Sequence, residues 1–140
     1  MDNATHSFDA EDPGMGAAIA QARSSLKDFF DRFTSPRPNQ DYFLLKVAFE
    51  EGAEVEHIWV GEIDGSVFPL AGTIGNAPRL PSLKFMQRVR FHPSRITDWM
   101  YIEDGYLVGG FTILAAREAM TPLERADYDA SVPYKFRRAL

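Results

Sequence analysis

A histidine and an aspartate are the side chains of this sequence whose types best suit acid–base chemistry. His57 lies in one apolar stretch and Asp98 in another. A carboxylate that orients an imidazole makes a general base, so the two would form one if a sheet brings them together. Glu56 cannot replace Asp98 as the partner, because neighbouring residues of a strand point to opposite faces. Structural ion pairs outnumber catalytic ones, and we therefore favour a hydrogen-bonded His57 in or near the core. For Asp98 we favour hydrogen bonds from turn amides or from an arginine such as Arg95.

Two tryptophans could form a second kind of site, a pocket for a ligand. Trp59 and Trp99 would be its walls. Tyr101 and Asn76 would offer polar contacts, as in binding sites that are mostly apolar with a few polar groups. The simpler interpretation, which we prefer, is that both tryptophans belong to the core.

The sequence lacks the motifs of common enzyme and cofactor classes. No serine stands in a Gly-x-Ser-x-Gly elbow, and the glycine spacing fits neither a dinucleotide-binding nor a phosphate-binding loop. The absence of cysteine excludes disulfides, thiol catalysis and thiolate metal sites, and there are only three histidines. We therefore expect no catalytic residues, no cofactor and no metal site.

The N-terminal residues are acidic and have neither the basic nor the apolar region of a secretory signal. The longest uncharged runs are too short for a membrane span and contain glycine or proline. The expected location is the cytoplasm, without membrane contact.

Charge is unevenly distributed along the chain. Residues 41–64 carry seven acids and one lysine, whereas residues 79–95 carry five basic residues and no acid. Basic residues interleaved with phenylalanines are typical of nucleic-acid-binding surfaces. The net charge of −5 and the core-like alternation of Val89 and Phe91 argue against nucleic acid here. We expect the basic segment to form a solvated face, to complement the acidic region within the fold, or to bind a protein partner. Its candidate partner-binding residues are Arg79, Lys84, Arg88 and Arg90.

The N-terminal part predicts a tail and one helix. Residues 1–11 have no periodicity and predict a mobile acidic tail, followed by a single domain over residues 12–140. Asp12 suits an N-cap and Pro13 the first helical position. Apolar residues then recur at spacings of three and four, so we expect one amphipathic helix that docks on a sheet. These residues are Met15, Ile19, Ala22, Leu26, Phe29, Phe30 and Phe33.

The middle of the chain predicts strands separated by turn signals. Pro69 demotes part of the third strand to an edge or a bulge. Strands are predicted over residues 42–49, 55–63, 67–74, 87–91, 96–102 and 106–108.

The hairpin over residues 96–110 is the centre of the predicted sheet. Its first strand is apolar on both faces, which is typical of a central strand. Alternation places Ile96 on the same face as Asp98 and puts Trp99 on the opposite face. Asp104-Gly105 tolerates the positive φ angles of a tight turn.

The C-terminal part predicts two short helices. Residues 111–120 contain helix formers, although Phe111-Thr-Ile-Leu could instead prolong the strand. Thr121-Pro122-Leu123-Glu124 is a capping box that starts a helix reaching Asp127 or Tyr128. The basic tail after it would pack only through Tyr134 and Phe136. The predicted class is α+β, a mainly antiparallel twisted sheet of five or six strands with the N-terminal amphipathic helix packed on one face and short C-terminal helices.

Four short motifs point to a family. They are Glu56-His57-x-Trp59, Asn76-x-Pro78, Ile96-x-Asp98-Trp99-Met100-Tyr101 and Gly109-Gly110-Phe111-Thr112. With them the chain resembles the YegJ-like family of small bacterial proteins, catalogued as a domain of unknown function, over residues 42–127. The resemblance implies no established activity, cofactor or catalytic residue. Domains of this kind are found alone or attached to ankyrin-type repeats, so the resemblance also implies an interaction role.

The leading hypothesis is an uncharacterised cytoplasmic bacterial protein that acts as a non-enzymatic protein-binding module, immunity-like or regulatory. The alternative is a small-molecule-binding domain or weak enzyme whose pocket involves His57, Trp59, Asp98 and Tyr101. The sequence makes no prediction of an oligomeric state.

Overall fold

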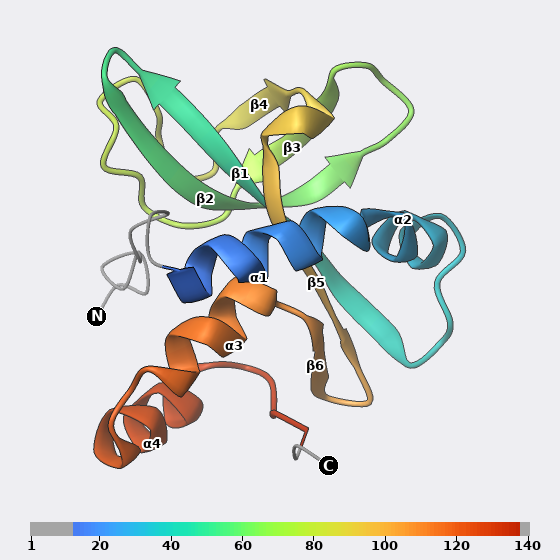
Figure 1. The fold of residues 1–140 in the computed structure, drawn as a ribbon. Helices are drawn as coiled ribbons and strands as arrows, with labels where there is room; N and C mark the ends of the chain where they lie inside the picture. Colours follow the sequence, from blue (N-terminus) through green and yellow to red (C-terminus); the bar gives the residue numbers. More distant parts are fainter. Residues whose placement is uncertain (1–12, 138–140) are drawn as a thin grey trace.

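The protein is built on an antiparallel sheet of six strands in the order β4-β3-β2-β1-β5-β6 (Figure 1). The computed structural model describes residues 13–137. The predicted tail over residues 1–11, the Asp12 cap and the last three residues of the basic tail lie outside the described residues. With the four α-helices of that range, the sheet confirms the predicted α+β class. The strands are β1 (Gln40–Glu51), β2 (Glu54–Asp64), β3 (Leu70–Ile74), β4 (Arg88–Phe91), β5 (Ile96–Glu103) and β6 (Tyr106–Gly109).

The two central strands are β2 and β1, and β1 pairs with β2 on one side and with β5 on the other. The prediction that the hairpin over residues 96–110 is the centre of the sheet was wrong, because β5 and β6 form one end of it. The β1–β2 and β5–β6 hairpins follow from adjacent sequence, but the β1–β5 pair joins segments about half the chain apart. The turn between β5 and β6 has positive φ at Asp104 (53°) and Gly105 (84°), as expected for this dipeptide.

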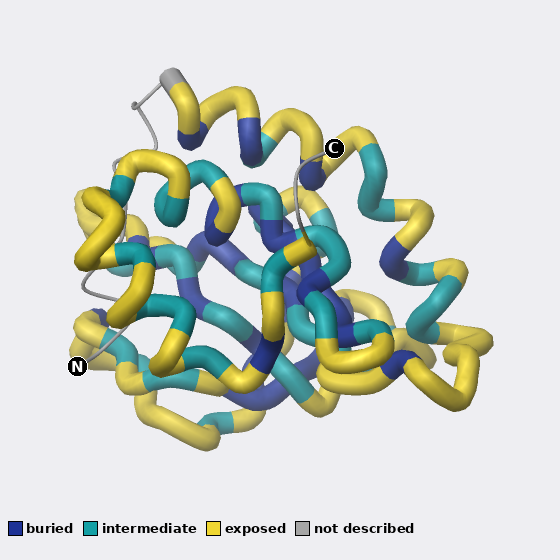
Figure 2. Tube along the Cα trace, turned by 90° about the horizontal axis from the view of Figure 1, so that it is seen from below, coloured by how far each residue is buried: buried dark blue, intermediate teal, exposed yellow. Residues whose placement is uncertain are grey.

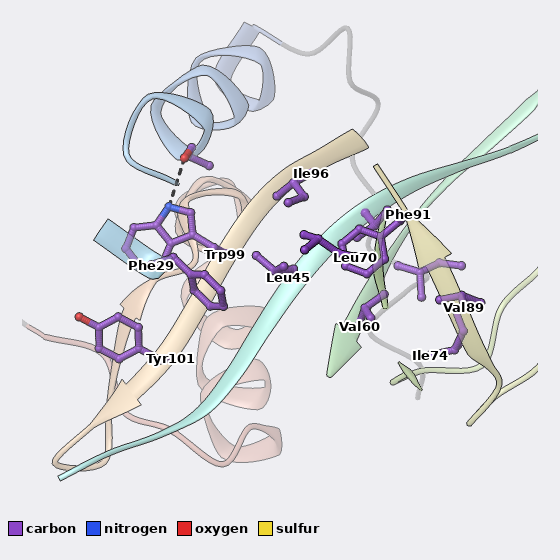
Figure 3. Packing of buried hydrophobic residues seen from close by; sticks show 13 residues of the cluster. Phe29, Leu45, Val60, Leu70, Ile74, Val89, Phe91, Ile96, Trp99 and Tyr101 are labelled. Carbon is purple, nitrogen blue, oxygen red and sulfur yellow. Dashed lines mark hydrogen bonds between the residues drawn. The ribbon is translucent and has the colours of Figure 1, made fainter. Parts of the chain in front are cut away.

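The predicted N-terminal helix is broken into α1 (Pro13–Ser24) and α2 (Leu26–Thr34). The Ser25 hydroxyl donates to the Gln21 carbonyl at 2.8 Å, and serine hydroxyls that bond to the backbone in this way compete with helix continuation. The indole Nε1 of Trp99 donates to the Ala22 carbonyl at 3.1 Å (Figure 3), a carbonyl that a continuous helix would use itself. The prediction of one continuous helix was therefore wrong at Ser25, where the indole of Trp99 in β5 donates hydrogen bonds to the turn between α1 and α2.

One face of the sheet, called the helix face below, is covered by α1 and α2. Figure 2 shows that the buried residues of these helices face the sheet and that their outer sides are exposed. Phe29 of α2 is fully buried, and its ring centroid lies 5.8 Å from that of Phe43 and 6.0 Å from that of Trp99 (Figure 3). The cluster around it contains Ala22, Leu45, Val47, Ile58, Val60, Leu70, Ile74, Val89, Phe91, Ile96 and Tyr101.

The opposite face, called the pocket face below, carries a smaller apolar cluster. It is partly covered by α3 (Phe111–Glu118), α4 (Pro122–Ser131) and the segment that follows α4. The helical alternative for residues 111–114 is the one found, and α4 starts with the predicted capping box. Tyr134 and Phe136 both pack here. The prediction that the tail packs only through them was wrong, because Val132 packs here too and the backbone of Lys135 bonds to that of Gly105 and Leu107. The buried members of the cluster are Met100, Ile102, Leu107, Ile113 and Tyr134.

A β-bulge in β5 changes which side chains share a face. β1 and β5 pair Lys46 with Asp98 and Val47 with Ile96, so Thr97 is an extra residue. Since one extra residue reverses the alternation, Ile96 joins the cluster of the helix face. The prediction that Ile96 and Asp98 share a face was wrong for this reason.

The glycine pair between β6 and α3 turns the chain sharply beside β5. Gly109 has φ of 77°, and a Cβ added to it would lie 2.5 Å from the Trp99 carbonyl oxygen. Gly110 also has positive φ, at 63°, and stands at the N-cap of α3. Only glycine combines this conformation with so close a backbone approach.

Candidate functional site

A pocket of about 460 Å³ opens on the pocket face of the sheet. Strands β1, β2 and β5 form its floor, and α3, α4 and the segment after β3 form its walls. Its volume lies within the range of small-molecule sites, and most of its lining is apolar. The floor residues are Leu44, Lys46, His57, Trp59 and Met100, and wall residues include Asn76, Met86, Ile113, Ala116, Met120, Tyr128 and Tyr134.

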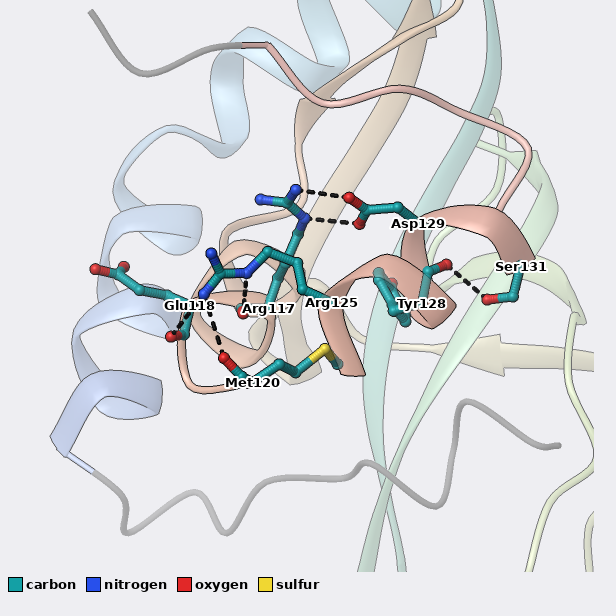
Figure 4. Close-up of polar contacts among 7 residues, drawn as sticks. All are labelled: Arg117, Glu118, Met120, Arg125, Tyr128, Asp129 and Ser131. Carbon is teal, nitrogen blue, oxygen red and sulfur yellow. Dashed lines mark hydrogen bonds and ion pairs between the residues drawn. The ribbon is translucent and has the colours of Figure 1, made fainter. Parts of the chain in front are cut away.

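Polar contacts between α3 and α4 hold one wall of the pocket in place (Figure 4). Arg117 forms a two-bond ion pair with Asp129, at 2.8 and 2.7 Å. Arg125 donates to the carbonyls of Arg117 and Met120 at the end of α3, both at 3.2 Å. These bonds fix the angle between the helices, and with it the positions of Met120 and Tyr128 in the wall.

Lys46 places an amine in the floor of this mostly apolar pocket. Its Nζ donates to the Thr112 hydroxyl at 3.0 Å and lies 5.3 Å from the centroid of the Trp59 ring. Burial lowers the pKa of Lys46, and the nearby carboxylate of Asp98 opposes this effect only in part. The pocket is therefore lined by a half-buried ammonium whose charge is compensated only in part.

Asp98 lies behind Thr112 and is fully buried. It accepts hydrogen bonds from the amides of Trp99 (2.8 Å), Phe111 (3.1 Å) and Thr112 (2.9 Å), and from the Thr112 hydroxyl. Gly110, at the N-cap of α3, has no side chain, so Asp98 caps this helix from a neighbouring strand. Burial raises the pKa of Asp98, while these hydrogen bonds and the charge of Lys46 act in the opposite direction.

Arg95 is not the partner of Asp98. Its Nε donates to the Ala48 carbonyl at 3.0 Å, and its Nη2 pairs with Glu50 at 2.8 Å. Of the two alternatives predicted for Asp98, the structure has the one with turn amides.

His57 lines the pocket but does not contact Asp98. Its Nδ1 lies 3.1 Å from the Thr97 hydroxyl, and its strand neighbour is Ala48, whereas Asp98 pairs with Lys46. Burial, together with the positive charges of Lys46 and Arg95, lowers the pKa of the imidazole. The less favoured alternative, a general base made of His57 and Asp98, is therefore not formed, and His57 is hydrogen-bonded as in the interpretation we favoured.

The proposed aromatic pocket divides between the two faces. Trp59 lines the pocket, and Asn76 lies beside it with Oδ1 accepting the Trp59 amide at 3.1 Å. Trp99 and Tyr101 are on the helix face, where their rings stack with centroids 6.0 Å apart. Alternation explains the division, because Met100 lines the pocket and its strand neighbours Trp99 and Tyr101 therefore point to the other face.

Three residues at the rim of the pocket have an uncommon backbone conformation, with positive φ. Four non-glycine residues among those described have positive φ, and three of them line this pocket. They are Tyr42 (59°), Glu62 (45°) and Met86 (71°). Tyr42 and Glu62 lie within the register shifts of β1 and β2, so bulges set both positions.

Sequence reasoning missed Lys46 and the rim residues. A single lysine in an amphipathic strand usually faces solvent, and only the pairing of β1 with β5 places it against Thr112. The available signal was that Leu44, Lys46 and Ala48 share a face with apolar neighbours on both sides of the lysine.

Most of the predicted partner-binding arginines are used inside the fold. Arg88 donates to the Glu62 carbonyl and to the Thr73 hydroxyl, and Arg90 donates to the Pro69 carbonyl. Arg79 lies 3.7 Å from the buried Glu56, whose other oxygen accepts the amides of Arg79 and Leu80. The Lys84 side chain is exposed. The predicted alternative in which the basic segment complements the acidic region is therefore found in part, at the ion pairs Arg79–Glu56 and Arg95–Glu50.

Two further features of residues 13–137 bear on function. None of their helices is long and apolar enough to cross a membrane. Their side chains form no group of three or more metal-ligating residues.

Comparisons with known proteins place the chain among bacterial proteins. A family model described as an uncharacterised protein conserved in bacteria (DUF2314) matches residues 12–136. The chain is 30% identical to a putative ankyrin repeat protein of Neisseria meningitidis serogroup B, with 93% of this chain and 55% of that protein covered. It is 27% identical to the uncharacterised protein YegJ of Escherichia coli K12, with 71% of this chain and 64% of that protein covered. No solved structure matches the chain.

These matches confirm the predicted YegJ-like resemblance. The family match is longer than the resemblance over residues 42–127, since it includes α1 and α2 and most of the C-terminal segment. The chain spans between half and two thirds of the length of the curated relatives it matches.

Proposed function

We propose that this chain, which belongs to the DUF2314 family of uncharacterised bacterial proteins, is a binding module whose ligand site is the pocket on the β1–β2 face. Its ligand is a small molecule with an apolar body. Binding rather than catalysis is proposed because the pocket brings Lys46, His57 and Trp59 together without a nucleophile and base in contact.

The observation that carries this proposal is the strained rim. A non-glycine residue in the left-handed region costs on the order of 1–3 kcal/mol, and such residues cluster at functional sites. Tyr42, Glu62 and Met86 all border one cavity, although they come from three separate segments of the chain. Strain that serves only to turn the chain would not be expected to collect at one place.

A pocket-filling variant tests the proposal. Ala116 lines the pocket from α3, so Ala116→Phe would occupy the space of a ligand. The matched control is Ala126→Phe, because Ala126 is exposed on α4 and does not line the pocket. We expect wild type and Ala126→Phe to bind a neutral solvatochromic dye such as Nile red, and Ala116→Phe to lose most of that binding.

Thermal unfolding measured with a metabolite library gives a second readout. A ligand present at one hundred times its dissociation constant stabilises the folded state by about 2.7 kcal/mol. Equal dye binding by all three proteins, together with no metabolite that stabilises wild type over Ala116→Phe, would contradict the proposal.

Protein binding, immunity-like or regulatory, is the second candidate function. Phe68 and Phe85 are exposed by 70% and 57%, and Phe85 follows the exposed Lys84. The relative from Neisseria meningitidis has a name that includes ankyrin repeats, which supports an interaction role in this family. A cytoplasmic site of action remains part of this proposal, and cell fractionation tests it.

The variants for this second test follow from the contacts of the basic segment. Arg88 and Arg90 hold backbone carbonyls of the sheet, so reversing their charge would disturb the fold. Lys84→Glu combined with Phe85→Ser changes two exposed side chains. Phe85 also lines the pocket, so Nile red binding by this double variant is measured alongside to show that the pocket is intact. If a pull-down from the host recovers the same proteins with wild type and with this double variant, binding through this surface is excluded.

A further inference from the structure

The charge of Lys46 is only partly balanced within the protein. Among the described residues, no carboxylate lies within 4.0 Å of its Nζ. The ion pairs of residues 13–137 are all formed by side chains other than Lys46. Thr112 Oγ1 is the one oxygen that accepts a hydrogen bond from it there. An ammonium has three N–H donors, so one hydrogen bond leaves donor capacity unused.

Asp98 compensates Lys46 from a distance and is itself already satisfied. Its carboxylate accepts three amides and the Thr112 hydroxyl, and it stands at the N-terminus of α3, where a negative charge is stabilised. Thr112 therefore separates the two charges: its oxygen accepts from Lys46, and its hydrogen is donated to Asp98. Lys46 lines the pocket, so its remaining N–H donors are available to a ligand there.

We infer that the pocket takes a small carboxylic acid in its ionised form, with the carboxylate on Lys46 and the apolar body along Trp59, Met100 and Ile113. This inference rests on the proposed function, namely that the pocket is a ligand site. A charge-assisted hydrogen bond in a site with little water is about twice as strong as a neutral one, so the carboxylate supplies affinity as well as orientation.

The charge of the pocket favours a monoanion over a phosphate monoester. Among residues 13–137, Lys46 is the only lysine or arginine that lines the cavity, and Glu62 lines it as well. One ammonium balances one negative charge, whereas a dianion would bring an unpaired charge into a mostly apolar space. His57 does not supply a second cation at neutral pH, because burial and neighbouring positive charges keep the pKa of its imidazole low.

The test compares acids with amides of the same shape. Decanoate with decanamide and 2-naphthoate with 2-naphthamide are titrated by calorimetry into wild type, Lys46→Met and Lys84→Met. Methionine keeps the length of the lysine stem and removes the charge. The Lys84→Met control removes an exposed lysine that does not line the pocket.

We expect at least one acid to bind wild type about tenfold more tightly than its amide, the factor that a charge-assisted hydrogen bond gives. Lys46→Met should remove this preference and still bind the amide, and Lys84→Met should retain the preference. The comparison of acid and amide in wild type stands even if a variant does not fold.

Three results would overturn the inference, and they are distinguishable. Equal affinity of acid and amide in wild type overturns the role of Lys46 and leaves the pocket as a ligand site. If the Lys46→Met protein still prefers the acid to the amide, the carboxylate of the ligand does not bind at Lys46. If neither acid nor amide of either shape binds wild type, and the dye binds wild type and Ala116→Phe alike, the proposed function fails together with the inference.

Discussion

The two faces of the sheet are covered by helices in different ways. On the helix face, α1 and α2 bring aromatic rings onto a continuous apolar surface, where the Trp99 indole donates to the Ala22 carbonyl and to Ser25. On the pocket face, α3 and α4 leave a cavity and enclose a lysine, a histidine and a carboxylate. The same strands therefore supply a stabilising core on one side and a site on the other, and each face should respond differently to substitution.

Removing the largest side chain of the helix-face core should have the largest effect. Phe29→Ala is expected to lower the free energy of unfolding by about 3–5 kcal/mol, because a fully buried ring leaves a cavity among Phe30, Phe33, Phe43 and Trp99. Urea denaturation measures this change.

The control for this variant is Leu123→Ala. Leu123 is 74% exposed on α4, so its loss should change stability by no more than about 0.5 kcal/mol. A cost for Phe29→Ala close to that of the control would mean that α2 does not stabilise the sheet, and the contrast between the faces would be lost.

On the pocket face, Asp98 is expected to be the most sensitive residue. Asp98→Ala leaves the amides of Phe111 and Thr112 and the hydroxyl of Thr112 without their acceptor. We expect a loss of about 2–4 kcal/mol, since buried donors without partners are costly. Urea denaturation gives the size of the loss.

Hydrogen exchange localises the effect of this variant. The amides of Phe111 and Thr112 should exchange faster, while β6 and α4 keep their protection. Asp127→Ala, which removes an exposed carboxylate of α4, serves as the control. Unchanged exchange at the start of α3 would show that Asp98 does not cap this helix.

Removing the pocket lysine should have the opposite sign. Lys46→Met is expected to stabilise the protein by about 1 kcal/mol at pH 7, because a buried charge is replaced by an apolar chain while Asp98 keeps its four donors. The expected sign is thus opposite to that on the helix face, where removing a core side chain destabilises the protein. The measurement is again the free energy of unfolding, followed as a function of pH.

The pH dependence identifies the charge as the cause. Burial lowers the pKa of Lys46 in the folded protein below its ordinary value of 10.5, so the unfolded chain binds more protons between these two pKa values. Wild-type stability should therefore rise with pH through that window. The advantage of Lys46→Met should shrink over the same window and disappear above pH 10.5. An advantage that is equal at pH 7 and above pH 10.5 would assign it to packing.

The same contrast explains which features could be predicted from the sequence. Periodicity and turn dipeptides predicted the strands, the α+β class and the short C-terminal helices, because these depend on local pattern. The break at Ser25 and the bulge at Thr97 could not be predicted, since both depend on contacts with distant segments. The candidate site was predicted in part: His57, Trp59 and Asn76 line the pocket.

The rest of the site depends on strand pairing. Lys46 became a pocket residue only because β1 pairs with β5, which brings Thr112 over it. Trp99 and Tyr101 were grouped with Trp59 by residue type, and alternation within the hairpin was sufficient to separate Trp99 from Asp98. Residue type thus suggested some members of the candidate pocket, and strand geometry determined which residues line it.

The smallest expected effect concerns His57, and it links the charges of the pocket face. Burial and the positive charges of Lys46 and Arg95 lower the pKa of this imidazole below its ordinary value of 6.5. Since the unfolded chain then binds more protons between the lowered pKa and 6.5, His57 makes stability rise with pH through that window. In an NMR titration the His57 ring should titrate below pH 6.5, and Lys46→Met should move its midpoint upward by removing one of the two charges. The same titration of Lys84→Met provides the control, because Lys84 is exposed and does not line the pocket, and its His57 midpoint should equal that of wild type. If the His57 midpoint is the same with and without Lys46, then Lys46 is uncharged or screened from the pocket, and the difference between the two faces of the sheet is one of packing alone.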